Sequence, residues 1–480
     1  MKHFVLPEDL NGFRIHLVGI KGTGMAALTE LLCAKGAVVT GSDVPEIFYT
    51  DAILNALGVK VFASFSPENI HPDTRLVIHS SAYSRQSNPE LIEAAKLSIP
   101  MLLYSEALGE FSAHSYSCGI AGVHGKTTTT GMAGTLLKGL DLDGSALAGS
   151  VISSFDDHCT MINGNRFFIA ETCEYQYHFL SFHPRKILLT SIESDHQDCF
   201  PTYESILSAF MQYINKLPQY GELIYCADDP GACEAARMIF SSRPDMVFTG
   251  YGEKATGDYR IEFKGIRNER QVFSLKGFPG DFKLKVPGRH NVKNAAGALA
   301  LTFSLAKEAG KEIDFSLLGK AREALESFSG SRRRCEIIGE SGGVLIIDDY
   351  GHHPTAIRST LEGLKEFYPE RRIIVDFMSH THSRTEALLE DFAASFGAAH
   401  EVILHKVYAS AREGPDTGAT GMKLFEAAKK KHKNVKFFQE VLEARPWLKE
   451  HLLPGDLFVT MGAGDNWRLG KAVLEDRRNV

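Results

Sequence analysis

The sequence predicts an α/β fold of three domains: an amino-terminal Rossmann-like domain, a central domain with a phosphate-binding loop, and a carboxy-terminal Rossmann-like domain. Its 480 residues exceed what one hydrophobic core normally holds. Short strand-like runs alternate with helical sequence along the chain, and two glycine-rich turns each join such a run to a helical pattern. We expect the domains to span residues 1–113, 114–329 and 330–480.

The composition is typical of a globular protein, with 44% hydrophobic and 23% charged residues. A net charge of −7 argues against a nucleic-acid partner. No apolar run approaches the roughly 20 residues of a membrane span, and the first residues lack the apolar region of a secretory signal. The eight cysteines are scattered without a C-x-x-C pair, which favours free thiols. We therefore expect a cytoplasmic protein that does not insert into membranes.

The first domain begins with a strand, a glycine-rich turn, a helix and a second strand. A strand over 13–18 runs into GIKGTG at 19–24, and a strand over 37–40 ends just before Asp43. An acidic residue about 20 positions past the glycines is typical of a dinucleotide site. The glycines are spaced G-x-x-G-x-G, however, so another phosphate-bearing nucleotide fits as well as NAD. A further strand over 75–80 ends in small polar residues, as at the carboxyl edge of a parallel sheet.

Residues 121–130, AGVHGKTTTT, carry the strongest chemical signal. A glycine turn between a strand and a helix directs backbone N–H groups and the helix dipole at one point. Lys126 can reach the outer phosphates of a nucleotide, and the Thr127 hydroxyl can ligate Mg²⁺. Only two residues separate Gly122 from Gly125, fewer than in the usual phosphate-loop pattern. We still favour a phosphate loop over a chance glycine turn.

The rest of the central domain predicts a second parallel sheet. Strand-like runs at 167–170, 186–190 and 222–226 alternate with helical sequence. The stretch from 245 to 290 is more typical of antiparallel strands, and the alanine-rich stretch from 292 to 305 predicts a closely packed helix.

Polar residues follow two of these strands. Glu171 comes directly after one strand and His196 soon after the next. If both strands share the sheet of the phosphate loop, these side chains can hold Mg²⁺ directly or through water. The alternative is that they are polar strand ends facing solvent, and the nearby loop favours the metal. Glu174 is a second candidate for contacting metal or substrate.

His290, Asn291 and Asn294 surround a turn into the predicted helix at 292–305. Asparagine amides can recognise a base or ribose through paired donors and acceptors. They also commonly cap helices. The residues leave both alternatives open.

The third domain shows four strand-like runs, at 343–348, 372–376, 401–404 and 456–460, separated by helical sequence. This pattern predicts another doubly wound sheet.

Two loops of the third domain are candidates for a site. The sequence DDYGHHP starts at Asp348, and two acids, a tyrosine and two histidines at a strand end suit a site. Zinc is a weak alternative there, because no cysteine or H-x-x-x-H partner accompanies the histidines. After the next strand, Arg384 can hold a carboxylate in a bidentate pair or be an exposed loop arginine.

Taken in order, GIKGTGM, GSD, SSA, AGVHGKTTTT, ESDH, CADDP, PGRHNVKNA, SRRRCE, DDYGHHPT, HSRT and GAGD make the whole chain resemble the Mur ligase family. Within it, DDYGHHPT and the S-R-T triplet most resemble the alanine-adding members. The resemblance implies an ATP-dependent amide ligase of peptidoglycan precursor synthesis. Such an enzyme joins L-alanine to the carboxylate of UDP-N-acetylmuramate through an acyl phosphate, with Mg²⁺.

The resemblance also implies a role for each candidate residue. Catalytic roles fall to Lys126, His196, His352 and Arg384. Nucleotide contacts fall to Gly122, His124, Gly125, Lys126, Thr127, Thr128, His290, Asn291, Asn294, Arg334 and Asp349. Metal ligands are Thr127, Glu171 and His196. Substrate contacts are Gly22, Thr23, Gly24, Asp43, Ser80, Ser81, Glu174, Tyr350, His352 and Arg384. The third domain is expected to bind the amino acid and close over ATP, in a monomer or weak homodimer.

Three positions depart from the family pattern. Lys21 replaces a usual glycine in the first loop, where it either adds a phosphate contact or points to solvent. Met211 stands where many members carry a carbamylated lysine, which the alanine-adding members also lack. His382 replaces a tyrosine near the expected alanine site.

Other activities compete with this interpretation. A related ligase that recycles muropeptides or extends folate is the main alternative. A nucleotide-gated binding protein without turnover is another, and the intact Lys126, Glu171, His196 and Asp349 argue against it.

Overall fold

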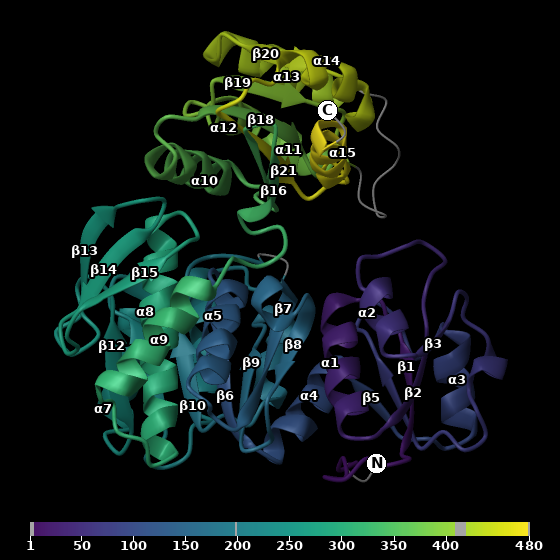
Figure 1. Cartoon of the computed structure of the whole chain (residues 1–480). Helices are drawn as coiled ribbons and strands as arrows, with labels where there is room; N and C mark the ends of the chain where they lie inside the picture. The colour runs from purple at the N-terminus through teal and green to yellow at the C-terminus, as the bar shows by residue number, and fades with distance from the viewer. Residues whose placement is uncertain (1–3, 197–198, 409–418, 479–480) are drawn as a thin grey trace. The chain divides into compact units, whose positions relative to one another are not determined.

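The computed structural model describes residues 4–196, 199–408 and 419–478 (Figure 1). The chain divides into two compact units. Unit 1 contains Met1–Lys264, Phe273–Lys283 and His290–Phe328, and unit 2 contains Gly265–Val272, Leu284–Arg289 and Ser329–Val480.

The first part of unit 1 is a five-stranded parallel sheet in the order β3-β2-β1-β4-β5. Its strands are β1 (Arg14–Val18), β2 (Val38–Ser42), β3 (Lys60–Phe62), β4 (Leu76–His79) and β5 (Met101–Leu103). Its helices are α1 (Thr23–Ala34), α2 (Asp51–Ala56), η1 (Pro67–Asn69), α3 (Pro89–Lys96) and α4 (Tyr104–Ala113). The predicted strands and first helix are confirmed. The strand order reverses at β1 and β4, so a ligand crevice is expected at their carboxyl ends.

The second part of unit 1 is a seven-stranded sheet in the order β12-β11-β10-β6-β9-β7-β8. Its strands are β6 (Tyr116–Ala121), β7 (Gly144–Ile152), β8 (His158–Ile162), β9 (Phe167–Glu171), β10 (Lys186–Leu189), β11 (Glu222–Cys226) and β12 (Val247–Tyr251). All neighbours are parallel except β7 and β8. Strands β9 and β10 flank β6, as the prediction for Glu171 and His196 required.

The helices of this part are α5 (Lys126–Gly139), η2 (Ser153–Phe155), η3 (Tyr175–Ser181), α6 (Tyr203–Ile214), α7 (Pro230–Ser242), α8 (Arg289–Glu308) and α9 (Phe315–Ser327). A separate three-stranded sheet contains β13 (Ile261–Ile266), β14 (Gln271–Leu275) and β15 (Asp281–Leu284). The prediction of antiparallel strands from 245 onward was wrong at its start, because β12 pairs in parallel with β11. Helix α7 connects β11 to β12, and such a crossover returns the chain in the same direction.

Unit 2 contains a six-stranded sheet in the order β16-β17-β21-β18-β19-β20. Its strands are β16 (Glu336–Ser341), β17 (Val344–Asp349), β18 (Arg372–Met378), β19 (Glu401–Leu404), β20 (Val435–Phe437) and β21 (Asp456–Gly462). Its helices are α10 (Pro354–Phe367), α11 (His382–Ala387), α12 (Leu389–Ala393), α13 (Ala419–Lys431), η4 (Val441–Glu443), α14 (Ala444–His451) and α15 (Trp467–Arg478). All four predicted strands are present. The sequence missed β16, which pairs antiparallel with β17, and the short β20.

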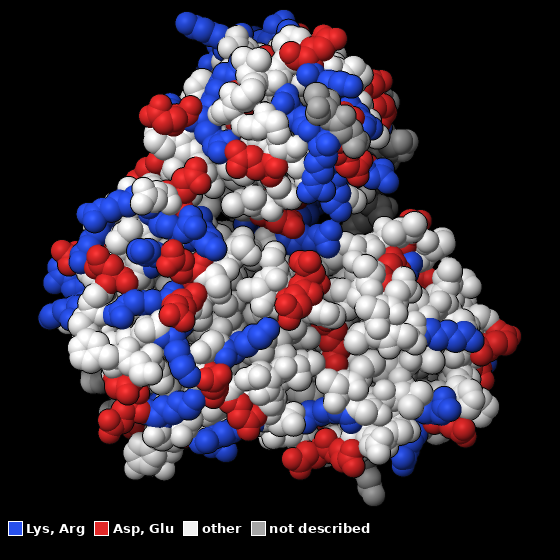
Figure 2. All heavy atoms as spheres, in the orientation of Figure 1, with Lys and Arg blue, Asp and Glu red and all other residues white. Residues whose placement is uncertain are grey.

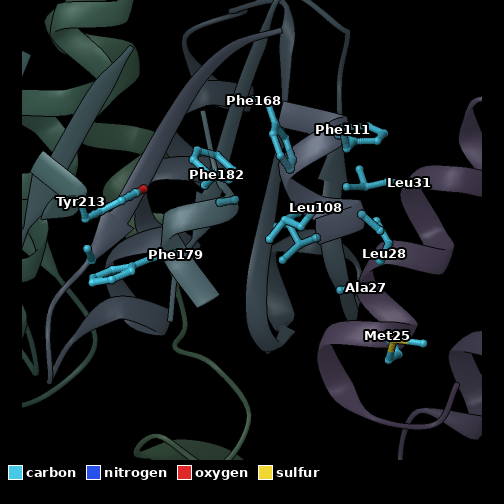
Figure 3. Close-up of a cluster of buried hydrophobic side chains, with 14 of the residues drawn as sticks. Met25, Ala27, Leu28, Leu31, Leu108, Phe111, Phe168, Phe179, Phe182 and Tyr213 are labelled. Carbon is cyan, nitrogen blue, oxygen red and sulfur yellow. The ribbon is translucent and has the colours of Figure 1, made fainter. Parts of the chain in front are cut away.

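One hydrophobic core joins the two sheets of unit 1. Leu28 and Leu31 of α1 lie beside Leu108 and Phe111 of α4, and Phe168 of β9 belongs to the same buried cluster (Figure 3). A continuous core of this kind holds the amino-terminal and central sheets together as one body.

A buried carboxylate forms hydrogen bonds across the same contact. The Glu30 carboxylate on α1 accepts hydrogen bonds from the His158 ring and the Thr160 hydroxyl, which both belong to β8. Burial raises the pKa of Glu30, although the bonds from His158 and Thr160 oppose this.

The surface and the cysteines agree with the composition. On the face shown in Figure 2, lysine and arginine side chains are interspersed with acidic ones. None of the helices in the described residues is long and apolar enough to cross a membrane. All eight cysteines are free thiols.

Candidate active site

The phosphate loop connects β6 to α5, and its two glycines are required by the backbone. Gly122 and Gly125 have φ angles of 136° and 80°. A β-carbon at Gly122 would lie 2.1 Å from the Thr190 hydroxyl oxygen, and one at Gly125 would lie 2.7 Å from the amide oxygen of Asn294. The loop therefore has room only for glycine at these positions, and it leads directly into the amino terminus of α5.

Lys126 is the first residue of α5, and its ammonium bends back over the loop. Its Nζ lies 3.1 and 3.0 Å from the two carboxylate oxygens of Glu174. It also donates to the carbonyls of Gly122 and Val123. Burial alone would lower the pKa of Lys126, but the charges of Glu174 and Glu171 outweigh it and raise the pKa. Lys126 is therefore a fixed positive charge at the loop.

Glu174 connects Lys126 to His196. The Glu174 side chain is only 1% exposed, and its Oε1 lies 3.6 Å from His196 Nε2. Burial opposes its ionisation, but the bond from His196 and the charge of Lys126 bring its pKa below the ordinary value. The bond to Glu174 in turn raises the pKa of His196, against the effect of burial. The structure thus brings together three residues that the sequence separates by up to seventy positions.

Glu171 lies at the end of β9 and is half-buried. Its Oε2 accepts a hydrogen bond of 2.8 Å from the Gly149 amide. Thr127 lies in the first turn of α5 and is half-buried. No group of three or more metal-binding side chains occurs among the described residues. Mg²⁺ usually binds through one or two protein oxygens together with phosphates and water, and the oxygens of Glu171 and Thr127 suit that role.

The two asparagines of α8 lie next to the phosphate loop. Asn294 faces Gly125, and its amide nitrogen donates to Asn291 Oδ1 over 3.1 Å. Both side chains are buried, and Asn294 lies within the helix instead of capping it. Of the other predicted nucleotide contacts, Thr128 is half-buried, and His124 and His290 are exposed near the same loop or helix start.

In the amino-terminal sheet, Asp43 holds the first glycine-rich turn. It is 5% exposed and accepts hydrogen bonds from the Lys21 amide, the Val44 amide and the Tyr83 hydroxyl. Gly22, Thr23 and Gly24 form the start of α1, and Ser80 and Ser81 follow β4. These predicted substrate residues therefore share the carboxyl edge of one sheet.

Tyr104 links this edge to the central sheet. A β-carbon at Gly24 would lie 2.8 Å from the Tyr104 ring. Tyr104 also lines a cavity of about 130 Å³ together with Glu171 and Gly149. Sequence reasoning missed Tyr104, because it lies in no motif and only the folded chain brings it between the two sheets.

In unit 2, the acidic pair at the end of β17 organises the loop that follows. Asp349 accepts hydrogen bonds from the amides of Cys335 and Gly351, at 2.8 and 2.7 Å. Asp348 pairs with Arg333 over 3.0 Å, and burial nevertheless raises its pKa to about 6. Nothing in the local pattern distinguishes Arg333 from its neighbouring arginines.

The remaining unit 2 candidates gather around His352. Its Nδ1 lies 3.1 Å from the Tyr350 carbonyl. Burial, together with the charges of Arg384 and Arg334, lowers its pKa to about 4. The Arg334 guanidinium lies 5.6 Å from the centre of the Tyr350 ring. Two cations beside a neutral imidazole are suited to receive an anionic ligand.

The adjacent histidine has a different role. His353 caps α10, and its ring nitrogen accepts from the Thr355 amide over 3.4 Å. His353 therefore has a structural role at the start of α10.

Comparison with known proteins identifies the family over nearly the whole chain. Residues 14–116 match "Mur ligase family, catalytic domain", residues 120–302 match "Mur ligase middle domain", and residues 333–464 match "Mur ligase, glutamate ligase domain". The UDP-N-acetylmuramate–L-alanine ligase of Treponema pallidum is 54% identical over 99% of this chain and 98% of its own length. The chain belongs to the Mur ligase family.

Further relatives agree. The UDP-N-acetylmuramate–L-alanine ligase of Borreliella burgdorferi is 40% identical over 96% of this chain and 98% of its own length. The crystal structure of the UDP-N-acetylmuramate–alanine ligase of Thermotoga maritima superposes with a TM-score of 0.78, at 26% identity, over 97% of this chain and 99% of that one. The three-domain α/β architecture expected of a Mur ligase is thereby confirmed.

The positions that depart from the family pattern have structural explanations. Met211 lies in α6 and packs against the hydrophobic core of unit 1. His382 begins α11, and its Nδ1 lies 3.3 Å from the Thr420 hydroxyl. We expected Lys21 either to contact a phosphate or to point to solvent. It is 6% exposed, so the second alternative is wrong.

Proposed function

We propose that this Mur ligase joins L-alanine to the carboxylate of UDP-N-acetylmuramate at the expense of ATP, in peptidoglycan precursor synthesis. The observation that carries the proposal is the cluster of Lys126, Glu174 and His196 at the phosphate loop. It occurs in a chain 54% identical to an enzyme named for this reaction.

Phosphoryl transfer needs alignment and charge neutralisation more than covalent help. Lys126 supplies a fixed positive charge, and the backbone amides at the start of α5 supply further donors. The Glu174 carboxylate, which also contacts His196, holds the ammonium in place. Asn294 lies against the loop and contributes a nucleotide contact from α8.

Mg²⁺ would be held by Thr127 and Glu171, with His196 as a third ligand directly or through water. When bound, the ion neutralises charge on the transferring phosphate. The residues of this chain then bind the nucleotide, align the carboxylate and keep Lys126 charged.

Unit 2 supplies groups suited to the amino acid. Arg384 can pair with the alanine carboxylate, and the neutral His352 can accept a hydrogen bond from the amino group of alanine. Tyr350 forms the wall beside His352. By the same proposal Arg334 contacts the nucleotide, whereas Asp349 acts by fixing the loop.

We further propose domain limits of 1–113, 114–329 and 330–480, and a cytoplasmic monomer or weak homodimer. In this proposal the third domain closes over ATP. Small-angle scattering should then show compaction when an ATP analogue and UDP-N-acetylmuramate are added together.

The activity is tested by measuring ADP release and the mass of the product. Continuous ADP release should require both UDP-N-acetylmuramate and L-alanine, and the nucleotide product should gain the mass of one alanine residue. A preference for a preformed peptide over alanine would instead indicate a muropeptide-recycling ligase. ATP binding without product from either acceptor would indicate a binding protein.

A further inference from the structure

The segment between β2 and α2, residues 44–50, has no regular secondary structure, and a single buried lysine holds it. Lys21 Nζ donates to the carbonyls of Val44, at 3.0 Å, and Glu46, at 2.7 Å. It also lies 3.3 Å from a carboxylate oxygen of Asp51, the first residue of α2. All three oxygens belong to this segment or to the residue that ends it.

Two further contacts make the attachment reciprocal. The Thr50 hydroxyl donates to the Lys21 carbonyl over 2.6 Å. The ammonium also lies 5.9 Å from the centre of the Phe48 ring, within the range of a cation–π contact. Lys21 is therefore bonded through its side chain and its main chain to both ends of the segment.

The burial of Lys21 makes these contacts necessary. Its side chain is 7% exposed, and an ammonium removed from water is stable only when its donors are satisfied and its charge is offset. Two carbonyls and one carboxylate meet that requirement. A shorter or uncharged residue at position 21 would release the segment.

The segment borders the predicted substrate crevice. The Tyr49 hydroxyl is hydrogen-bonded to the Thr23 hydroxyl in the glycine-rich turn. At the tip, Ile47 is 92% exposed and Phe48 is 42% exposed. These exposed apolar side chains lie beside the carboxyl edge of the sheet and are available to contact a bound ligand.

We propose that Lys21 is a positioning residue that fixes the 44–50 segment as one wall of the site for the UDP-linked substrate. This inference rests on the proposed function for the identity of that substrate. Because the segment is ordered before the substrate arrives, binding does not have to supply the free energy of ordering it. Lys21 should therefore affect substrate affinity more than the chemical step.

The decisive variant is Lys21→Met, which keeps the length of the side chain and removes its charge. We expect amide hydrogen exchange in residues 44–50 to become at least about tenfold faster without ligand, because local opening no longer breaks the lysine contacts. The KM for UDP-N-acetylmuramate should rise about tenfold, with kcat within about twofold of wild type. Lys96→Met, at an exposed position of α3, is the matched control and should change neither quantity.

Asp51→Asn supplies an independent variant. It should reproduce part of both effects, and Lys21→Met combined with Asp51→Asn should add little to Lys21→Met alone, since both remove one interaction. Unchanged exchange in residues 44–50 of both variants would overturn the positioning role. So would faster exchange with an unchanged KM. The exchange measurement needs no substrate, so it separates failure of this inference from failure of the proposed activity.

Discussion

Two glycine-rich turns of unit 1 look alike in sequence, and each contains a buried lysine, but the two lysines have different partners. Lys126 ends the turn between β6 and α5 and bends over it. Lys21 lies inside the turn between β1 and α1 and reaches away from it, to the segment after β2. Both are largely buried, at 12% and 7% side-chain exposure.

The partners of the two lysines explain the difference. Lys126 pairs with Glu174, a side chain beyond the end of a neighbouring strand, where ligands of parallel sheets bind. A phosphate oxygen can share or replace such a partner. Lys21 bonds to main-chain carbonyls, which belong to the fold and cannot be exchanged. Loss of Lys126 should therefore affect the rate, and loss of Lys21 the affinity.

The largest expected effect is that of Lys126→Ala. Removing an electrostatic contact to the transferring phosphoryl group costs on the order of 3–4 kcal/mol, so turnover should fall several hundredfold or more. The measurement is kcat at saturating ATP, with circular dichroism to confirm folding. Lys138→Ala, an exposed residue of the same helix, is the control. More than about a tenth of wild-type turnover would contradict the assignment, because a tenfold loss is only about 1.4 kcal/mol.

Glu171→Ala should act on the metal. If Glu171 holds Mg²⁺ beside Thr127, the half-saturating Mg²⁺ concentration should rise about tenfold or more and turnover should fall. Titration of activity with Mg²⁺ measures this, and Glu204→Ala, an exposed acid in the first turn of α6, is the control. A normal Mg²⁺ requirement in both Glu171→Ala and His196→Ala would return these residues to the role of polar strand ends.

The sequence predicted the loops and strand ends of each site better than the contacts between residues that lie far apart in the chain. The phosphate loop and the strands that end at Glu171 and Asp349 follow from local patterns and are present in the structure, whereas the roles of these residues and of His196 stay predictions. The direction of Lys21 could not be predicted, because its partners lie on a segment that only the folded chain brings near. Tyr104 was missed for the same reason. Strand β12 was misjudged because its partner is set by a crossover helix and not by its own residues.

A smaller expected effect concerns the pKa of His352, a buried group whose surroundings differ from those of Lys126. Despite burial, the carboxylates of Glu174 and Glu171 raise the pKa of Lys126, whereas His352 is buried beside Arg384 and Arg334, and its pKa falls to about 4. The ring should stay neutral at pH 7 and titrate near pH 4. Nuclear magnetic resonance can follow it, with His352→Gln to assign the signal. A midpoint near 6.5, the ordinary value, would contradict the burial argument.

The same pKa fixes the sign of a stability effect. Between pH 6.5 and about 4 the unfolded histidine binds a proton that the folded one does not, so its contribution to stability falls as the pH is lowered. The raised pKa of Asp348, about 6, acts in the opposite direction over a similar range. Only the difference between wild type and His352→Gln therefore isolates the histidine. The free energy of unfolding of wild type should fall relative to that of the variant by up to roughly 3 kcal/mol on acidification.

The fate of one oxygen atom tests the proposed reaction most directly. If the carboxylate of UDP-N-acetylmuramate attacks the γ-phosphate of ATP, one carboxylate oxygen joins the phosphorus. When the amine of alanine then attacks the acyl carbon, that oxygen leaves with the phosphate. With both carboxylate oxygens labelled as ¹⁸O, mass spectrometry should find one labelled oxygen in each phosphate released by the wild-type enzyme. Amide formation with unlabelled phosphate would contradict the account, because ATP would then have been split by water and not by the substrate carboxylate.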